Sequence, residues 1–186
     1  MTSLPALWLP ILLSAVFVFV ASSLIHMASP WHKGDFPKLR NQEQVMDALR
    51  PLAIPPGDYL FPRPTSREEM RSPEFAEAMK RGPVVLMTVM PSGPMSMGRN
   101  LGQWFAYCLF ISLLSAYVAS RALPAAARFA DVFRFASTTA LLAYAAALWQ
   151  MSIWYRRAWN LTLKATIDGL VYAAITGAVI GWLWPK

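Results

Sequence analysis

The sequence has one cysteine, two histidines and ten acidic residues among 186. Because Cys108 is alone, no intrachain disulfide can form, and cysteine usage does not indicate a cellular compartment. GxSxG, HExxH and a glycine-rich phosphate loop are also absent, which predicts a protein that is not an enzyme. A membrane enzyme stays open as an alternative, and its candidate residues are Asp58, Glu68, Glu69 and His32.

Acidic residues are scarce relative to basic ones, with ten against seventeen, a net charge of +7 and a pI near 9.9. This excess does not predict nucleic-acid binding. Residues 28–100 hold ten Lys/Arg and eight Asp/Glu, and the two signs are interspersed. No basic face for a phosphate backbone is visible, so nucleic acid is excluded as a partner.

Charge is absent from residues 101–120 and 135–155, and two further apolar stretches cover about 7–27 and 166–184. A helix needs about 20 apolar residues to cross the hydrocarbon core of a bilayer. The sequence therefore predicts an all-α membrane protein with four transmembrane helices. Its predicted partner is the lipid bilayer.

The first apolar stretch resembles a secretory signal peptide because small residues follow it. It has no Lys or Arg before Lys33, Pro5 and Pro10 interrupt its start, and its apolar run is too long for such a peptide. We therefore expect a retained span. The predicted divisions are a first helix with a short tail (1–27), an extramembrane module (28–100) and a three-helix transmembrane unit (101–186).

Lys and Arg near the span ends predict the orientation, because cytoplasmic flanks carry the excess. The side of the long segment has seven: Lys33, Lys38, Arg40, Arg99, Arg156, Arg157 and Lys164. The side of the termini has four: Arg121, Arg128, Arg134 and Lys186. This difference predicts cytoplasmic residues 28–100 and termini outside the cell.

The extramembrane module is rich in proline but contains signals of order. Ser72 as cap, Pro73 in the first turn and Gly82 as stop predict a helix over about 73–81. A second short helix is predicted near 42–49, with an extended proline-rich segment after it, and the apolar run 83–90 fits a strand. Few aliphatic residues make a thin core, so we expect the module to lean on the membrane surface or on a partner.

Small residues recur every fourth position in the last apolar stretch: Gly169, Ala173, Gly177 and Gly181. In lipid such a face lets two helix backbones approach closely. We favour packing against the third span of the same chain. Self-association, or docking on another membrane subunit, is the alternative.

Asp168 is the one acid at the edge of an apolar stretch, and an ionisable residue in a membrane helix marks a candidate ion or proton pathway. Gln150 and Arg134 are the residues that would line such a path with it. We favour a structural reading, with Asp168 in the first helical turn near the headgroups and Lys164 four residues before it.

Imidazoles and thioethers gather near the end of the first span and in the later part of the module. Both are ligands that Cu(I) prefers. The candidate copper ligands are His26, His32, Met87, Met90, Met95 and Met97. Methionine is also an ordinary apolar filler, and neither histidine has another one turn away to form a zinc or haem pair. We therefore predict no cofactor, with copper as the alternative.

Several strings occur together: His32–Phe36, Val45–Leu49, Pro55–Tyr59, Met90–Gly98, Trp149–Arg157 and Asp168–Leu170. On these strings the chain resembles a family of uncharacterised bacterial multi-pass membrane proteins over nearly its whole length. The resemblance implies a bacterial inner membrane and carries over no activity and no functional residue.

With no catalytic motif and a small-residue helix face, the sequence favours a non-enzymatic accessory or scaffolding subunit of a membrane assembly. The alternative is a small oligomeric transporter or channel. Four spans are few for a transporter, so this alternative requires self-association.

Overall fold

The structure is a computed structural model that describes residues 2–185. The chain forms two compact units. The first contains residues up to Phe36 together with Ser96 onward, and the second is Pro37–Met95. The second unit is thus shorter than the predicted module 28–100, because the residues just after the first span belong to the membrane unit. Each unit is described by itself.

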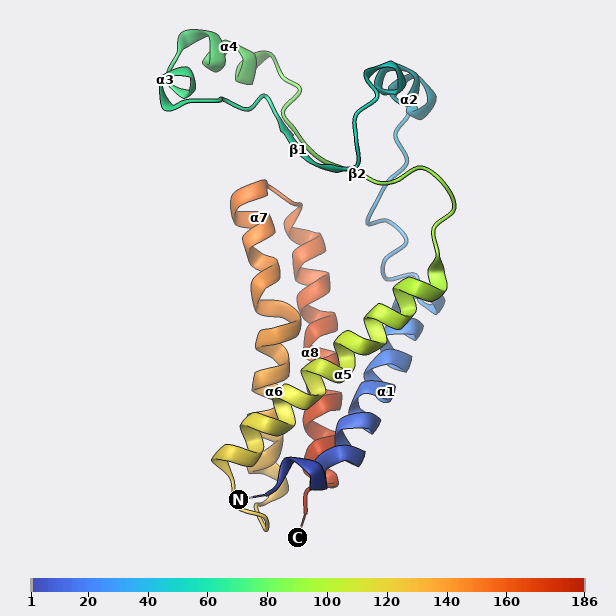
Figure 1. The fold of residues 1–186 in the computed structure, drawn as a ribbon, viewed down its shortest axis with the longest axis vertical. Coiled ribbons are helices and arrows are strands. Elements are labelled where there is room, and N and C mark those ends of the chain that lie inside the picture. The colour runs from blue at the N-terminus through green and yellow to red at the C-terminus, as the bar shows by residue number, and fades with distance from the viewer. Residues whose placement is uncertain (1, 186) are drawn as a thin grey trace. The chain divides into compact units, whose positions relative to one another are not determined.

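Four helical spans make up the first unit, and the protein is an all-α multi-pass membrane protein, as predicted. The spans are Leu4–Ala28, Met97–Ala122, Phe129–Tyr155 and Trp159–Trp182. Their main helices are α1 (Trp8–Ser23), α5 (Met97–Ala122), α6 (Phe129–Ala145) with α7 (Trp149–Tyr155), and α8 (Trp159–Trp182). In Figure 1 both termini lie at one end of these helices.

The third and fourth spans begin six and seven residues earlier than predicted, because the helices continue through charged residues. Arg134 fits inside α6 because its exposed side chain pairs with Asp131 one turn earlier. Lys164 fits inside α8 because its amino group reaches residues from another segment. A charge therefore marks the end of an apolar stretch without marking the end of a helix. The connection 123–128 is a non-helical turn, and α6 begins directly after it.

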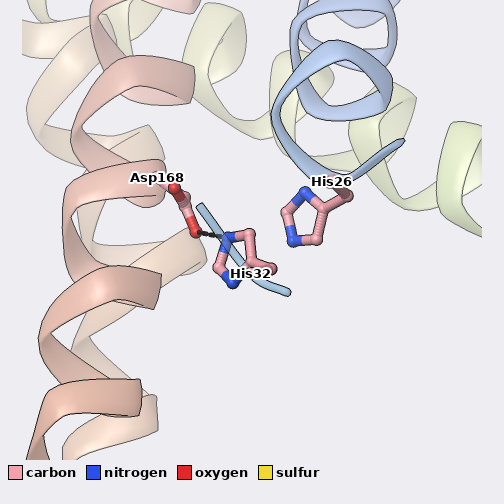
Figure 2. A group of neighbouring side chains, drawn as sticks. All are labelled: His26, His32 and Asp168. Atoms are coloured by element: carbon pink, nitrogen blue, oxygen red, sulfur yellow. Dashed lines mark hydrogen bonds and ion pairs between the residues drawn. The ribbon is translucent and has the colours of Figure 1, made fainter. Parts of the chain in front are cut away.

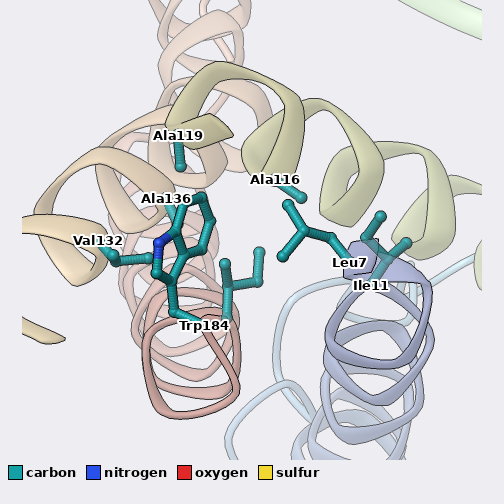
Figure 3. Close-up of a cluster of buried hydrophobic side chains, with 8 residues drawn as sticks. Leu7, Ile11, Ala116, Ala119, Val132, Ala136 and Trp184 are labelled. Atoms are coloured by element: carbon teal, nitrogen blue, oxygen red, sulfur yellow. The ribbon is translucent and has the colours of Figure 1, made fainter. Parts of the chain in front are cut away.

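The four spans pack in a ring in which α1 contacts α5, α5 contacts α6, α6 contacts α8 and α8 contacts α1. One core cluster lies near the termini, where the Trp184 side chain points in among residues of α5 and α6 (Figure 3). Its indole Nε1 donates to the Pro124 carbonyl at 3.0 Å. The second cluster lies further along the bundle and contains Ala15, Val18, Cys108, Ile111, Ala140, Tyr144, Tyr172 and Ala173.

The closest packing is between α6 and α8, and it uses the predicted small-residue face. A Cβ added at Gly177 would lie 2.8 Å from Ser137 Cβ and 3.0 Å from the Phe133 carbonyl oxygen. A Cβ at Gly169 would lie 2.9 Å from Ala145 Cβ, and one at Gly181 would lie 3.0 Å from the Phe129 ring. Ala173 on the same face is buried. The structure therefore supports packing within the chain, the reading favoured from the sequence.

The second unit contains a two-stranded antiparallel sheet of β1 (Gly57–Phe61) and β2 (Val85–Val89), with Tyr59 opposite Met87. Helix α2 (Gln42–Leu49) precedes the sheet, and α3 (Arg67–Met70) and α4 (Pro73–Arg81) lie in the connection between the strands. The predictions of α2 and α4 are confirmed.

Local signals explain the bounds of α4. The Ser72 hydroxyl accepts a hydrogen bond from the Phe75 amide at 3.1 Å. Lys80 and Arg81 lie in the last turn, where cations suit the helix dipole. Gly82 ends the helix at φ +58°, a conformation that glycine adopts without steric cost.

The substitution Gly177→Ala tests the α6–α8 packing. The added methyl would overpack the contact with Ser137 and Phe133, so we expect the free energy of unfolding to fall by about 1–3 kcal/mol. The measurement is thermal or denaturant unfolding of the purified protein in detergent.

The matched control is Gly102→Ala in α5, because no atom apart from its chain neighbours and its own helix backbone lies within 4 Å of the added Cβ. Alanine favours a helix by up to about 1 kcal/mol over glycine, so this variant should be as stable as wild type or slightly more so. Equal stability of the two variants would show that Gly177 is not needed for close packing.

Candidate functional site

Two histidines meet at the end of the first span. α1 continues into a π-helical turn, Leu24–Ala28, in which the Ser29 amide donates to the Leu24 carbonyl five residues back. His26 lies in this turn, and its Nδ1 donates to the Ser22 carbonyl at 3.0 Å. The His26 and His32 rings stack with centroids 4.3 Å apart and planes at 12° (Figure 2). π-helical turns are rare in proteins, but those that occur are often found at functional sites.

His32 bridges two carboxylates. Its Nδ1 donates to Asp35 Oδ2 at 2.6 Å, and its Nε2 donates to Asp168 Oδ2 at 3.0 Å (Figure 2). The His32 ring is therefore held on both edges, by a carboxylate from its own loop and by one from α8.

Lys164 completes the network from α8. Its Nζ donates to Asp35 Oδ1 at 2.6 Å and to the Trp31 carbonyl at 2.8 Å, and it lies 5.5 Å from the centroid of the Trp31 ring. The hydrogen bond from Lys164, and then that from His32, hold the pKa of the Asp35 carboxyl below its ordinary value of 3.8. Lys164 and Asp35 therefore form an ion pair beside the His32 ring.

Asp168 does not lie where the sequence suggested. The prediction placed it in the first turn of its helix, but α8 begins at Trp159 and Asp168 is in the third turn. It is 5% exposed. Its hydrogen-bond partner is His32, whereas Lys164 pairs with Asp35. The prediction was wrong because it started the helix after Lys164, and the helix dipole therefore does not account for this carboxylate.

The proposed pathway residues do not converge. Asp168 is buried at the end of the bundle near residue 32, whereas Arg134 and Gln150 are exposed. Arg134 pairs with Asp131 on its own helix. The described side chains therefore do not form a polar path through these three positions.

The candidate copper ligands are divided between the two units. His26, His32 and Met97 belong to the first, and Met87, Met90 and Met95 belong to the second. Within the first unit, His26 and Met97 line a pocket of about 370 Å³ between α1 and α5. The other lining residues are Ser22, Ser23, Met27, Leu101 and Trp104.

Three ligand atoms instead gather around Asp168. His26, His32 and Asp168 each offer one nitrogen or oxygen, and these atoms lie within 4.8 Å of one another. Sequence reasoning named all three residues but assigned Asp168 to a different site, and it did not name Asp35 or Trp31 as part of the site. The available signals were Asp35 three residues after His32 and Lys164 four residues before Asp168.

A second candidate surface lies in the extramembrane unit. Within residues 37–95, all of which the structure describes, none is buried. Its α2 helix leaves Val45, Met46 and Leu49 exposed at 42%, 51% and 38%. Such an apolar face on a short helix is typical of a binding surface.

Comparison with protein-family models, with curated proteins and with solved structures returns no match to this chain. The family resemblance of the sequence therefore stays an expectation. The side chains themselves have to indicate the function.

The lowered pKa of Asp35 gives a pH prediction. A carboxyl whose pKa is lower in the folded state stabilises that state above its unfolded pKa, and the stabilisation is lost as the pH falls through the folded pKa. We therefore expect wild type to exceed Asp35→Asn in thermal stability at pH 6, and the gap to narrow at a pH below 3.8. The measurement is thermal unfolding in detergent with a chelator.

The control is Asp47→Asn, which removes an exposed ion pair with Arg50. Pairs of this kind contribute little to stability, so this variant should match wild type at both pH values. A gap for Asp35→Asn that is equally large at low pH would contradict the assigned role of its charge.

Proposed function

We propose that the protein is a non-enzymatic accessory or scaffolding subunit of a larger membrane assembly, which it contacts through its extramembrane unit. The observation that carries this proposal is the absence of any buried residue within the fully described segment 37–95. A folded unit without a core of its own needs another surface to bury its apolar side chains.

The energetics support a partner for this unit. Ordering the backbone costs about 1–2 kcal/mol per residue, and burial of apolar area is the main term that offsets it. A two-stranded hairpin is marginal alone. Many large apolar side chains of the unit are exposed: Leu39, Val45, Met46, Leu49, Leu52, Leu60, Phe61, Met70, Met79, Val84, Leu86, Met90 and Met95.

The charges of α2 favour a protein partner over a lipid surface. Helices that lie on a membrane are rich in Lys and Arg on the polar face. The sequence of α2 is QEQVMDAL, with Glu43 and Asp47 and no basic residue. An acidic helix with an exposed apolar face suits a groove on another subunit better than anionic headgroups.

The packing of α8 bears on which surface the partner uses. The glycine face of α8 lies against α6 of the same chain, so it is already occupied. This favours the extramembrane unit, rather than the glycine face, as the contact with other subunits.

The excess of Lys and Arg beside the long segment supports an orientation with residues 28–100 in the cytoplasm and both termini outside. The resemblance to bacterial multi-pass proteins supports the bacterial inner membrane as the location. The partner would then be an inner-membrane subunit with a cytoplasmic groove.

Native mass spectrometry in mild detergent, after extraction from the organism's own membrane, tests the proposal. We expect a foreign subunit at fixed stoichiometry. Val45→Glu should lower its occupancy at least about tenfold, equivalent to about 1.4 kcal/mol of binding free energy. The reason is that a charge in a buried apolar contact is strongly unfavourable.

Gln44→Glu adds the same charge on the opposite face of α2 and should leave the complex intact. A bare monomer or a homo-oligomer in place of a mixed complex would refute the proposal. Equal loss of the partner in both variants would show that the apolar face of α2 is not the contact.

A further inference from the structure

We propose that His26, His32 and Asp168 form a binding site for one divalent transition-metal ion at the end of the membrane bundle. Their ligand atoms come from the π-turn after α1, from the following loop and from α8 (Figure 2). The three residues belong to one compact unit. The site is independent of the proposed partner contact, which lies in the other unit.

The donor set suits a metal of borderline softness. Two imidazole nitrogens with one carboxylate oxygen are typical of zinc and of non-haem Fe(II) centres, with the other coordination positions left to water or substrate. Three donors lying within 4.8 Å of one another leave space for one ion among them. His26 is exposed, so water has access to that side of the site.

In both histidines a hydrogen bond engages Nδ1, which leaves Nε2 as the nitrogen that can bind a metal. His26 Nδ1 donates to the Ser22 carbonyl, which leaves Nε2 with the lone pair. His32 Nδ1 donates to Asp35, the carboxylate–histidine arrangement that commonly supports a metal ligand. Asp35 is in turn held by Lys164 at 2.6 Å. Asp35 and Lys164 are therefore positioning residues.

The ion takes the place of one hydrogen bond. His32 Nε2 and Asp168 Oδ2 are 3.0 Å apart, and the proton between them passes to solvent when the ion binds. Ligands of a tetrahedral zinc ion are about 3.3 Å apart, so this pair needs little movement. The stacked His26 ring has to turn toward the ion, and its place at the exposed end of α1 permits this.

A Cu(I) site with thioether ligands would differ from the proposed divalent site in its ligands. Met97 and Met27 line the pocket beside His26, but Asp168 does not. A carboxylate is a hard ligand that Cu(I) does not favour. The role of Asp168 therefore separates the divalent site from a methionine-based copper site.

The test is a titration of the full-length protein, purified in detergent and stripped with a chelator, with Co²⁺ and with Zn²⁺. We expect one ion per chain, with Co²⁺ giving visible d–d absorption bands and Zn²⁺ displacing it. The absence of saturable binding of either ion would overturn the proposal.

His26→Ala is the decisive variant, because His26 is exposed and its hydrogen bond is to its own helix, so the fold does not depend on it. We expect its affinity for both ions to fall at least about tenfold and its Co²⁺ spectrum to change. The affinity of Asp168→Asn for both ions should fall by a similar factor. Size-exclusion chromatography checks that this variant is folded. Unchanged affinity in His26→Ala would overturn the site.

The variant Asp35→Asn tests whether Asp35 positions His32 or is itself a metal ligand. We expect weaker binding by about 10–100-fold, the usual effect of losing a supporting carboxylate, with the Co²⁺ spectrum retained. Asp131→Asn, which removes an ion pair with Arg128 and Arg134, should bind as wild type does. Binding of Cu(I) alone, lost in Met97→Leu but not in Asp168→Asn, would refute the divalent site.

Discussion

The close approach of α6 and α8 is the constraint on which the membrane unit depends. Lipid tails are as apolar as the side chains of the helices, so burial of apolar area does not drive two helices together within a bilayer. Association relies instead on van der Waals contact, which requires short distances between backbones. Gly169, Gly177 and Gly181 provide them because each lacks the Cβ that would otherwise collide with α6.

The contact between α6 and α8 also determines where the Asp168 side chain points. Gly169 faces Ala145 of α6, and its neighbour Asp168 points toward the residues that follow α1. A buried carboxylate requires a cation and hydrogen bonds, since desolvation of an unpaired charge is very unfavourable. His32 supplies the hydrogen bond to Asp168, and the ion pair of Lys164 with Asp35 lies at the other edge of the same ring. Through these contacts the loop after α1, up to Phe36, is part of the packed membrane unit.

The sequence was sufficient for the number of spans, for α2 and α4, and for the glycine face, because these depend on local composition and spacing. It was insufficient for the site. The meeting of His32 with Asp168 joins positions 136 residues apart, and no local pattern contains that information. The helix start at Trp159 was also missed, because Lys164 was taken as the end of the apolar stretch although its side chain has partners within the protein. The few aliphatic residues of segment 28–100 predicted a thin core, and no residue within 37–95 is buried.

The network around His32 has a consequence for the order of assembly. Lys164 and Asp168, which pair with Asp35 and His32 of this loop, follow them in the chain by 129 and 136 residues and belong to α8. Until α8 is made, Asp35 and His32 lack these partners. The ring of four spans therefore closes only when α8 brings its carboxylate to the loop after α1.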